Sequence, residues 1–425
     1  MRLISADWVV PVEGDPIESG AVTIGDDGRI SGVGSAAELG GGERFDGAVI
    51  APGFVNAHSH LEYAVYAGFG DGLPFALWIG LHVRRKSVLD QAEMEAIARL
   101  GAADCLRSGV TTVGDASFSG AAATACAELG LRATVFLEVF GGVDAIAQRF
   151  EPMRERLDGA LPDRVRLGIS PHAPYTCTPE LYEASLALGL PVTTHLSESE
   201  HEAAYVRDGS GPWSELAGLL VEPLGTSGIR ALAERDLLGP SLVAAHCVTV
   251  DADEIALLAG HDVAVVHCPR SNGFLGCGVA PLTELRRAGV RVSIGTDSPA
   301  STPGFDVFEE LRAAVAGARA REQDAGALLA REALELGTLA GARVLGLEDE
   351  VGSLVPGKQA DLVVVSLEGS PFDPAEDPAA ALVLGGSPDR VLATLVGGEE
   401  RYRKGTTEWR DLRRAARSAR SRMLR

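Results

Sequence analysis

The stretch AVIAPGFVNAHSHLEY, residues 48–63, is an apolar, β-branched run that ends in two histidines and a glutamate. Side chains of an extended strand point alternately to opposite faces. His58, His60 and Glu62 would therefore point to the same side if the chain stayed extended. Such a group can hold a metal ion, although two histidines at this spacing also occur on ordinary solvated strands. The rest of the chain has to decide between these two interpretations.

The same kind of run recurs seven more times before about residue 300, and helix-like stretches rich in Ala, Leu and Glu separate the runs. Glycines at the ends of these stretches are typical helix stops. Eight runs that are apolar on both faces and alternate with helices predict an α/β fold, a closed parallel (β/α)8 barrel of the TIM type. The seven runs are GVTTVGD (109–115), RATVFLEVF (132–140), VRLGISPHAP (165–174), PVTTHLSE (191–198), SLVAAHC (241–247), DVAVVHCP (262–269) and RVSIGTDS (291–298).

Polar residues gather where these runs end. In a barrel of this type the C-terminal ends of the strands ring one mouth, and active sites form there. Six of the nine histidines occupy such ends, which strand capping would explain for one histidine but not for six. The polar residues at the ends are His58, His60, Asp115, Glu138, His172, His195, Glu198, His246, His267 and Asp297.

The two ends of the chain differ from this middle part. Residues 1–50 and 350–408 show short strands with tight turns, and predict one small composite β-sandwich domain beside a barrel of residues 51–349. Residues 206–228 are long for a loop of a barrel, and fit either a mobile cover over the mouth or a short structural helix with loops. Residues 409–425 contain seven arginines and predict a basic, solvated helix, with a contact in a homo-oligomer as the alternative.

Composition narrows the class of partner. A formal net charge of −21 argues against binding to nucleic acid or to an anionic membrane. No apolar run is long enough to span a bilayer, and the N-terminus does not resemble a signal peptide. Six scattered cysteines without a CxxC pair indicate reduced thiols in the cytoplasm. The charge does not identify a substrate, and we expect a small molecule.

The polar residues at the strand ends predict a metal centre. Three imidazoles and one carboxylate form a ligand set that a borderline divalent ion such as Zn²⁺ prefers, with a position left for water. We expect His58, His60, His195 and Asp297 to be the ligands. No lysine ends the fourth strand, so no carboxylated bridge to a second ion is evident, and one metal ion is the simpler expectation.

Two further residues are candidates for moving a proton. Glu198 follows His195 by three residues and can take a proton from water and hand it on if its site is enclosed. His246 ends the sixth strand and could hydrogen-bond the same water. It could instead be a further nitrogen ligand, because such ions favour imidazole.

At these residues the chain resembles the amidohydrolase superfamily, and within it the branch of nucleoside and aminoheterocycle deaminases and chlorohydrolases. The motifs that carry the resemblance are APGFVNAHSH, SPHAPYTCT, THLSES, AAHCV, HCPRSN, GTDSPAS and GKQADLVVV, which span nearly the whole chain. The resemblance implies a hydrolase in which a hydroxide adds to an amidine-like ring carbon and ammonia leaves.

The resemblance also implies roles for individual residues. One zinc or iron ion would be held by His58, His60, His195 and Asp297, with Glu198 as proton shuttle, His246 and Asp297 acting on the water, and His172 contacting the substrate. A barrel that binds metal without turnover would have no need of Glu198. Hydrolysis of a ring amide or loss of chloride is the alternative reaction.

The substrate is harder to predict. Relatives that deaminate S-adenosylhomocysteine or methylthioadenosine resemble the chain at LPFALWI, but usually carry a glutamate before the tryptophan, where this chain has Leu77 before Trp78. The form HSHLEY is more similar to aminofutalosine deaminases, so aminodeoxyfutalosine is a specific candidate. Glu62 and Trp78 are then expected near the substrate. Arg84, with Arg85, could face a carboxylate of that substrate or could simply face solvent.

Overall fold

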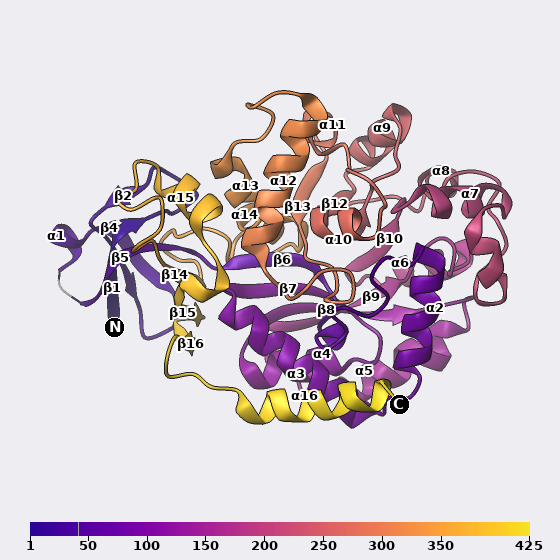
Figure 1. Ribbon diagram of the computed structural model, residues 1–425, viewed down its shortest axis with the longest axis horizontal. Coiled ribbons are helices and arrows are strands. Elements are labelled where there is room, and N and C mark those ends of the chain that lie inside the picture. The colour runs from indigo at the N-terminus through magenta and orange to yellow at the C-terminus, as the bar shows by residue number, and fades with distance from the viewer. Residues whose placement is uncertain (41) are drawn as a thin grey trace.

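Eight parallel strands form a barrel in the computed structural model, which describes residues 1–40 and 42–425 (Figure 1). Neighbours in sequence are neighbours in the sheet, and a bridge from Ser59 to Asp297 joins the first strand to the segment after the last. This confirms the predicted (β/α)8 barrel. The strands are β6 (Phe54–Ser59), β7 (Val110–Ser117), β8 (Arg132–Val139), β9 (Val165–Pro171), β10 (Val192–Leu196), β11 (Leu242–His246), β12 (Ala264–His267) and β13 (Arg291–Ile294).

Helices alternate with these strands and bury their apolar faces against them. The helix that precedes β7 shows the local signals: Asp90 caps it, Glu93 completes a capping box, and alanines with Met94, Ile97 and Leu106 line its buried face. These helices are α3 (Gln91–Arg107), α4 (Ala121–Leu129), α5 (Glu151–Leu157), α6 (Pro179–Ala187), α7 (Glu200–Asp208), α8 (Gly228–Ala233), α9 (Ala252–Gly260), α10 (Pro269–Phe274), α11 (Leu282–Arg287), α12 (Val307–Glu322), α13 (Ala330–Leu336) and α14 (Leu339–Val344).

The two ends of the chain together form a second, mixed sheet, as expected for a composite domain (Figure 1). Hydrogen bonds join its strands in the order β16-β15-β14-β5-β1-β3-β4, with β2 beside β1, and its apolar side chains form a core of their own. The strands are β1 (Arg2–Val9), β2 (Ile17–Glu18), β3 (Gly20–Ile24), β4 (Ile30–Ser35), β5 (Glu43–Pro52), β14 (Leu362–Ser366), β15 (Val391–Val396) and β16 (Glu399–Arg403), with the helices α1 (Ala36–Leu39) and α15 (Pro378–Gly385).

The stretch 48–63 passes from one sheet to the other. Its first residues complete β5, and after Gly53 the chain enters β6, the first barrel strand. A Cβ atom at Gly53 would lie 2.1 Å from the side chain of Thr111, so only glycine fits at this crossing. The tight crossing fixes where β6 begins, and therefore where its two histidines end up.

Two segments outside the strands of the barrel pack against each other. One is α2 (Phe75–Lys86), which follows the short helix η1 (Leu61–Tyr63), and the other is η3 (Pro212–Leu219), within the stretch of uncertain role. They meet through aromatic rings, with centroids 5.3 Å apart for Phe75 and Trp213. Within residues 206–228 Trp213 is buried against Phe75, whereas most of the neighbouring residues are exposed, and a role as a cover stays a prediction. Two further short helices are η2 (Ile146–Phe150) and η4 (Pro388–Arg390).

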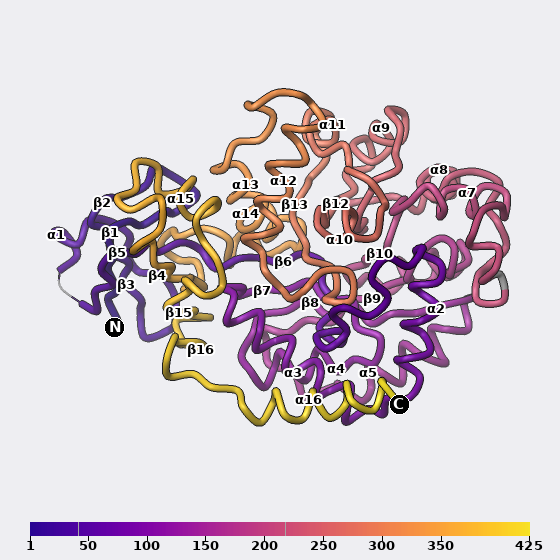
Figure 2. Tube along the Cα trace, viewed as in Figure 1, coloured from indigo at the N-terminus to yellow at the C-terminus, as the bar shows by residue number. Residues whose placement is uncertain are grey.

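The C-terminal helix α16 (Arg410–Met423) lies along α3 on the outside of the barrel (Figure 2). Most of its arginines are exposed, as expected of a basic helix. One face, however, is buried and docks on the protein, so the helix is not solvated all round. Among the described residues no helix is both long and apolar enough to cross a membrane.

The two domains are joined by a buried ion pair that makes a testable prediction. Arg132 of β8 donates to both carboxylate oxygens of Asp361, at 3.0 and 3.2 Å, and both side chains are buried. Arg132→Ala would leave the Asp361 charge buried and unpaired, and we expect it to lower the free energy of unfolding by about 3–5 kcal/mol.

Arg44→Ala serves as the control, because the Arg44–Asp7 pair is exposed and its loss should cost only about 0–1 kcal/mol. Denaturant unfolding of both variants measures the difference. If both variants lost the same free energy of unfolding, the buried ion pair between the domains would stabilise the protein no more than the exposed pair does.

Candidate active site

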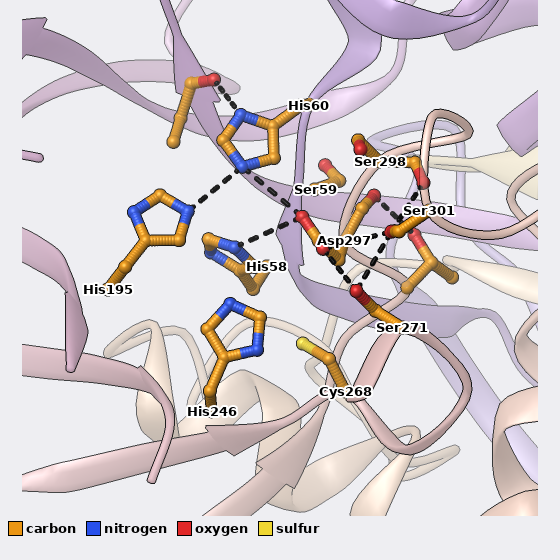
Figure 3. Close-up of polar contacts among 12 residues, drawn as sticks. His58, Ser59, His60, His195, His246, Cys268, Ser271, Asp297, Ser298 and Ser301 are labelled. Atoms are coloured by element: carbon orange, nitrogen blue, oxygen red, sulfur yellow. Dashed lines mark hydrogen bonds and ion pairs between the residues drawn. The ribbon is translucent and has the colours of Figure 1, made fainter. Parts of the chain in front are cut away.

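Four residues from the ends of three barrel strands meet at the mouth. His58 ends β6, His60 follows it, His195 comes from β10, and Asp297 lies just after β13. One ligand atom from each lies within 4.8 Å of the others, and all four side chains are buried. Figure 3 shows the three imidazole rings turned toward the Asp297 carboxylate.

The hydrogen bonds of two of these histidines fix their tautomers. His60 Nδ1 lies 2.9 Å from the carbonyl oxygen of Ala116, and His195 Nδ1 lies 2.9 Å from that of His172. A carbonyl oxygen only accepts, so both Nδ1 atoms carry the proton and both Nε2 atoms present lone pairs. These two Nε2 atoms are 3.2 Å apart. Two lone pairs at that distance repel each other unless a cation lies between them.

Burial keeps these imidazoles neutral. It lowers the pKa of His58 well below its ordinary value, with the neighbouring histidines adding to the effect, and it lowers the pKa of His60 to about 3. His58 Nε2 is buried without a hydrogen-bond partner. Neutral rings with unpartnered lone pairs fit a divalent metal ion.

Asp297 is held so that one oxygen faces the histidines. Its Oδ1 lies 3.4 Å from His60 Nε2 and 3.7 Å from His58 Nε2. Its Oδ2 accepts hydrogen bonds from the hydroxyls of Ser271 at 2.5 Å and Ser301 at 3.1 Å. Burial alone would raise the pKa of Asp297, but the adjacent His60 and the bond from Ser271 bring it below the ordinary value. The carboxylate is therefore charged and fixed.

The backbone at Asp297 is also unusual. Its φ of +55° lies in the left-handed region, which most residues other than glycine avoid. The Asp297 amide donates to the carbonyl oxygen of His58 at 3.0 Å, across the barrel seam. His246 has a φ of +76° at the end of β11. Such backbone strain clusters at functional sites, where the surrounding structure holds it in place.

Glu198 and His246 form a second group with Asp297, in which one ligand atom from each lies within 4.8 Å of the others. Glu198 Oε1 is 3.8 Å from His246 Nε2, and His246 Nδ1 hydrogen-bonds Asn272 Oδ1 at 2.9 Å. Burial, and then the charge of Asp297, raise the pKa of the Glu198 carboxyl well above its usual range. This arrangement can hold and pass on a proton beside the four-residue group.

Glu202, which the sequence analysis missed, positions Glu198. Its two carboxylate oxygens accept hydrogen bonds from the backbone amides of Ser197 at 2.9 Å and Glu198 at 2.6 Å. Burial raises the pKa of Glu202 to about 8, and the nearby Glu198 charge adds to the shift. The spacing Glu198–Glu202 was visible in the sequence. It did not show that Glu202 lies in the first turn of α7 with its carboxylate turned back onto the Glu198 backbone.

A third group, Glu138, His172 and His195, also brings possible ligand atoms within 4.8 Å. His195 cannot serve a second ion, because its Nδ1 donates to a carbonyl oxygen and its Nε2 faces His60. His172 Nδ1 pairs with Thr176 Oγ1 at 2.8 Å, which leaves Nε2 for another contact. The geometry therefore fits one metal ion, with His172 and Glu138 beside it.

Glu62 does not join the metal group. Its carboxylate accepts from the amide and hydroxyl of Ser119, from the Ala121 amide at 3.1 Å, and from the Ser117 hydroxyl. With so many donors from the turn after β7, Glu62 anchors that turn and has little capacity left for a substrate. The chain bends into η1 after His60, which ends the alternation of side chains that was expected to carry through to Glu62.

The two expected substrate contacts on α2 differ in exposure, and their roles stay predictions. Trp78 is half-buried, with its ring 4.1 Å from that of His82, whereas Arg84 is exposed. The basic residue that turns toward the site is Lys86. Its Nζ donates to the Tyr63 hydroxyl at 2.7 Å and lies 3.6 Å from the centroid of the Phe118 ring.

Lys86 is unusual for a lysine. Burial lowers its pKa to about 8, although Glu138 and Glu62 act in the opposite direction. Within residues 1–40 and 42–425 no carboxylate forms an ion pair with this ammonium. Lysines are rarely buried unless they are paired. The sequence offers three basic residues in a row at the end of α2, and only the orientation of the helix shows which one faces inward.

The metal group makes a direct prediction. His195→Ala should remove one of the two facing lone pairs, and metal measured in the folded, purified protein should fall sharply. His201→Ala, an exposed histidine on α7, should keep the wild-type metal content. Full metal content in a folded His195→Ala variant would show that the ligand set is wrong.

Comparisons with known proteins agree with this site. The model of the amidohydrolase family matches residues 49–401. A 5-methylthioadenosine/S-adenosylhomocysteine deaminase of Moorella thermoacetica is 35% identical, over 96% of each chain. A 5'-deoxyadenosine deaminase of Methanothermobacter thermautotrophicus is 32% identical over 92% of this chain and 91% of that protein.

Solved structures agree as well. The structure of an adenosine deaminase from Xanthomonas campestris with bound zinc superposes with a TM-score of 0.89 at 30% identity, and covers 99% of this chain and 98% of that one. The atrazine chlorohydrolase of Arthrobacter aurescens shares the fold, with a TM-score of 0.83 at 24% identity over the full length of both chains. From the family match and the identity over nearly its whole length, the chain belongs to the amidohydrolase family.

Proposed function

We propose that the protein is a metal-dependent deaminase that replaces the exocyclic amino group of a purine nucleoside or related aminoheterocycle by oxygen from water and releases ammonia. The observation that carries the proposal is the buried Glu198 carboxyl next to the group of His58, His60, His195 and Asp297. The similar proteins of Moorella and Methanothermobacter are named as deaminases of adenosine derivatives, which supports this reaction over hydrolysis of a ring amide or loss of chloride.

The four residues at the seam would hold one divalent ion, with zinc favoured by the bound zinc of the Xanthomonas adenosine deaminase. A bound ion of this kind acidifies water and stabilises negative charge that develops on the substrate. The serines that bind Asp297 Oδ2 keep its other oxygen turned toward the histidines. Such supporting bonds orient the ligands before the ion arrives.

Glu198 would move the proton. It would accept a proton from the attacking water and deliver it to a ring nitrogen of the substrate. The added hydroxyl would then lose its proton through Asp297 to the amino group, so that the carbon–nitrogen bond breaks, a carbonyl forms and ammonia leaves. His246, oriented by Asn272, would hydrogen-bond the same water, and Asp297 would take part in its activation. His172 has one ring nitrogen available for a contact with the substrate. Glu202 would keep the Glu198 backbone in place.

The side chain of Lys86 indicates which class of nucleoside the protein prefers as substrate. Leu77 stands where the similar deaminases usually have a glutamate, and its side chain is 51% exposed, so it supplies no carboxylate to a ribose. Lys86 instead offers a part-buried ammonium that forms no ion pair among the described residues. This favours a substrate with an acidic group, such as aminodeoxyfutalosine, over the neutral methylthioadenosine. The six buried, unpaired cysteines support a reducing compartment such as the cytoplasm.

The proton shuttle is tested by Glu198→Gln. This variant keeps the shape of the side chain but cannot exchange a proton, so ammonia release should fall by about 100-fold or more while metal content stays unchanged. The assay is ammonia released from a panel of adenosine derivatives, aminodeoxyfutalosine, guanine, cytosine and pterins. Full turnover by Glu198→Gln would refute the mechanism.

The preference for an acidic substrate is tested with a pair of adenosine derivatives that carry a carboxylate or the matching carboxamide on the sugar side. Wild type should favour the carboxylate in kcat/KM by about tenfold, the worth of one charge-assisted hydrogen bond. Lys86→Met should lose this preference.

Arg84→Met is the matched control, because Arg84 lies on the same helix but is exposed. It should keep the preference for the carboxylate. If Lys86→Met lowered kcat/KM equally for both compounds, Lys86 would not read the acidic group.

A further inference from the structure

The C-terminal helix α16 has a narrow apolar face that is buried partly by the segment after β6. Ala416, Ala419 and Met423 repeat at helical spacing and are all buried. They share one apolar cluster with residues of the segment after β6, namely Val65, Tyr66 and Phe69, and with Ile97 of α3. The helix therefore covers the back of the segment that begins one residue after His60.

Arg420 ties α16 to this segment through its backbone. Its guanidinium donates to the carbonyl oxygens of Val65 and Ala67, the latter at 3.1 Å. The same group lies 4.2 Å from the centroid of the Phe69 ring. Arg420 is half-buried, whereas the other arginines of α16 are exposed. Arg420 binds the segment that follows His60, whereas Arg422 binds the residues between α2 and α3.

A second arginine, on α2, binds α16 in the opposite direction. Arg85, near the end of α2, lies 4.1 Å from the centroid of Phe69 and donates to the carbonyl oxygen of Met423 at 2.9 Å. The last carbonyl groups of a helix have no partner within the helix, so Arg85 completes the C-terminus of α16. Phe69 contacts both guanidinium groups, one from each end of the connection.

The tied segment leads directly into the active site. It contains Glu62, which anchors the turn after β7, and Tyr63, whose hydroxyl accepts from Lys86. The Tyr63 ring is 5.6 Å from the ring of His60. Lys86 directly follows Arg85 on α2, so a shift of α2 moves both side chains. Movement of residues 61–86 would therefore displace Tyr63 and Lys86, which lie beside the metal group.

We infer that α16 acts as a brace for residues 61–86, and that Arg420 is a positioning residue that keeps Tyr63 and Lys86 in place for substrate binding. The arrangement needs no contact between α16 and the substrate. It gives the basic C-terminal helix a role in the site that its exposed arginines do not suggest. Loss of the brace should weaken substrate binding more than it slows the chemical step, because Glu198, His195 and Asp297 lie on or just after other strands.

The test uses two variants of the full chain, Arg420→Ala and Ala419→Glu, the second of which places a charge at a buried position of the docked face. Backbone hydrogen exchange should become faster in residues 61–86 and remain unchanged in strands β11 to β13. With the best substrate found for the proposed deaminase, KM should rise about threefold or more while kcat changes by less than about twofold.

Arg417→Ala is the matched control, since Arg417 is exposed one turn earlier on α16, and it should behave as wild type. Arg420→Lys, which can reach only one of the two carbonyl oxygens, should fall between wild type and Arg420→Ala. The inference is overturned if exchange in residues 61–86 is unchanged, if it accelerates equally throughout the chain, or if KM stays at its wild-type value. The kinetic measurement rests on the proposed function, whereas the exchange measurement does not, so failure of one can be told from failure of the other.

Discussion

The closure of the barrel between its first and last strands is the constraint on which the site depends. The Asp297 amide donates to the His58 carbonyl oxygen across this seam, and the backbone of Asp297 adopts a left-handed conformation to do so. The seam brings an acid from one end of the barrel sequence beside two histidines from the other. His195, from the middle of the barrel, then completes the group, with its Nε2 turned toward that of His60. The metal group and the candidate proton shuttle Glu198 both lie beside that junction.

In several residues around this junction, one polar atom of the side chain is held by a hydrogen bond and the other stays available for a ligand. Nδ1 of His60 and of His195 is committed to a carbonyl oxygen, which frees Nε2. One oxygen of Asp297 is committed to two serines, which frees the other. Both carboxylate oxygens of Glu202 accept hydrogen bonds from backbone amides, those of Ser197 and Glu198. Each buried donor or acceptor committed in this way fixes the direction of the atom that remains available, which is how a flexible side chain becomes part of a preorganised site.

Much of this could be predicted from the sequence, because strand ends are local features. The period of apolar runs predicted the barrel, and the histidines at the run ends could be assigned to one mouth without knowing any distance. Other features depend on tertiary direction. The turn into η1 sends Glu62 away from the histidines, and the rotation of α2 exposes Arg84 while it turns the ammonium of Lys86 inward, onto Tyr63. The docking of α16 rests on two alanines and a methionine, too few to stand out in an arginine-rich stretch.

The central claim is that water replaces an amino group at this site. Its most direct test is to incubate the metal-loaded protein with adenosine derivatives in oxygen-18 water, and to measure ammonia and the labelled product together. The account predicts equal amounts of ammonia and of a product that carries the heavy oxygen at the carbon that held the amino group. Product formed without ammonia, or ammonia formed without incorporation of the label, would contradict it.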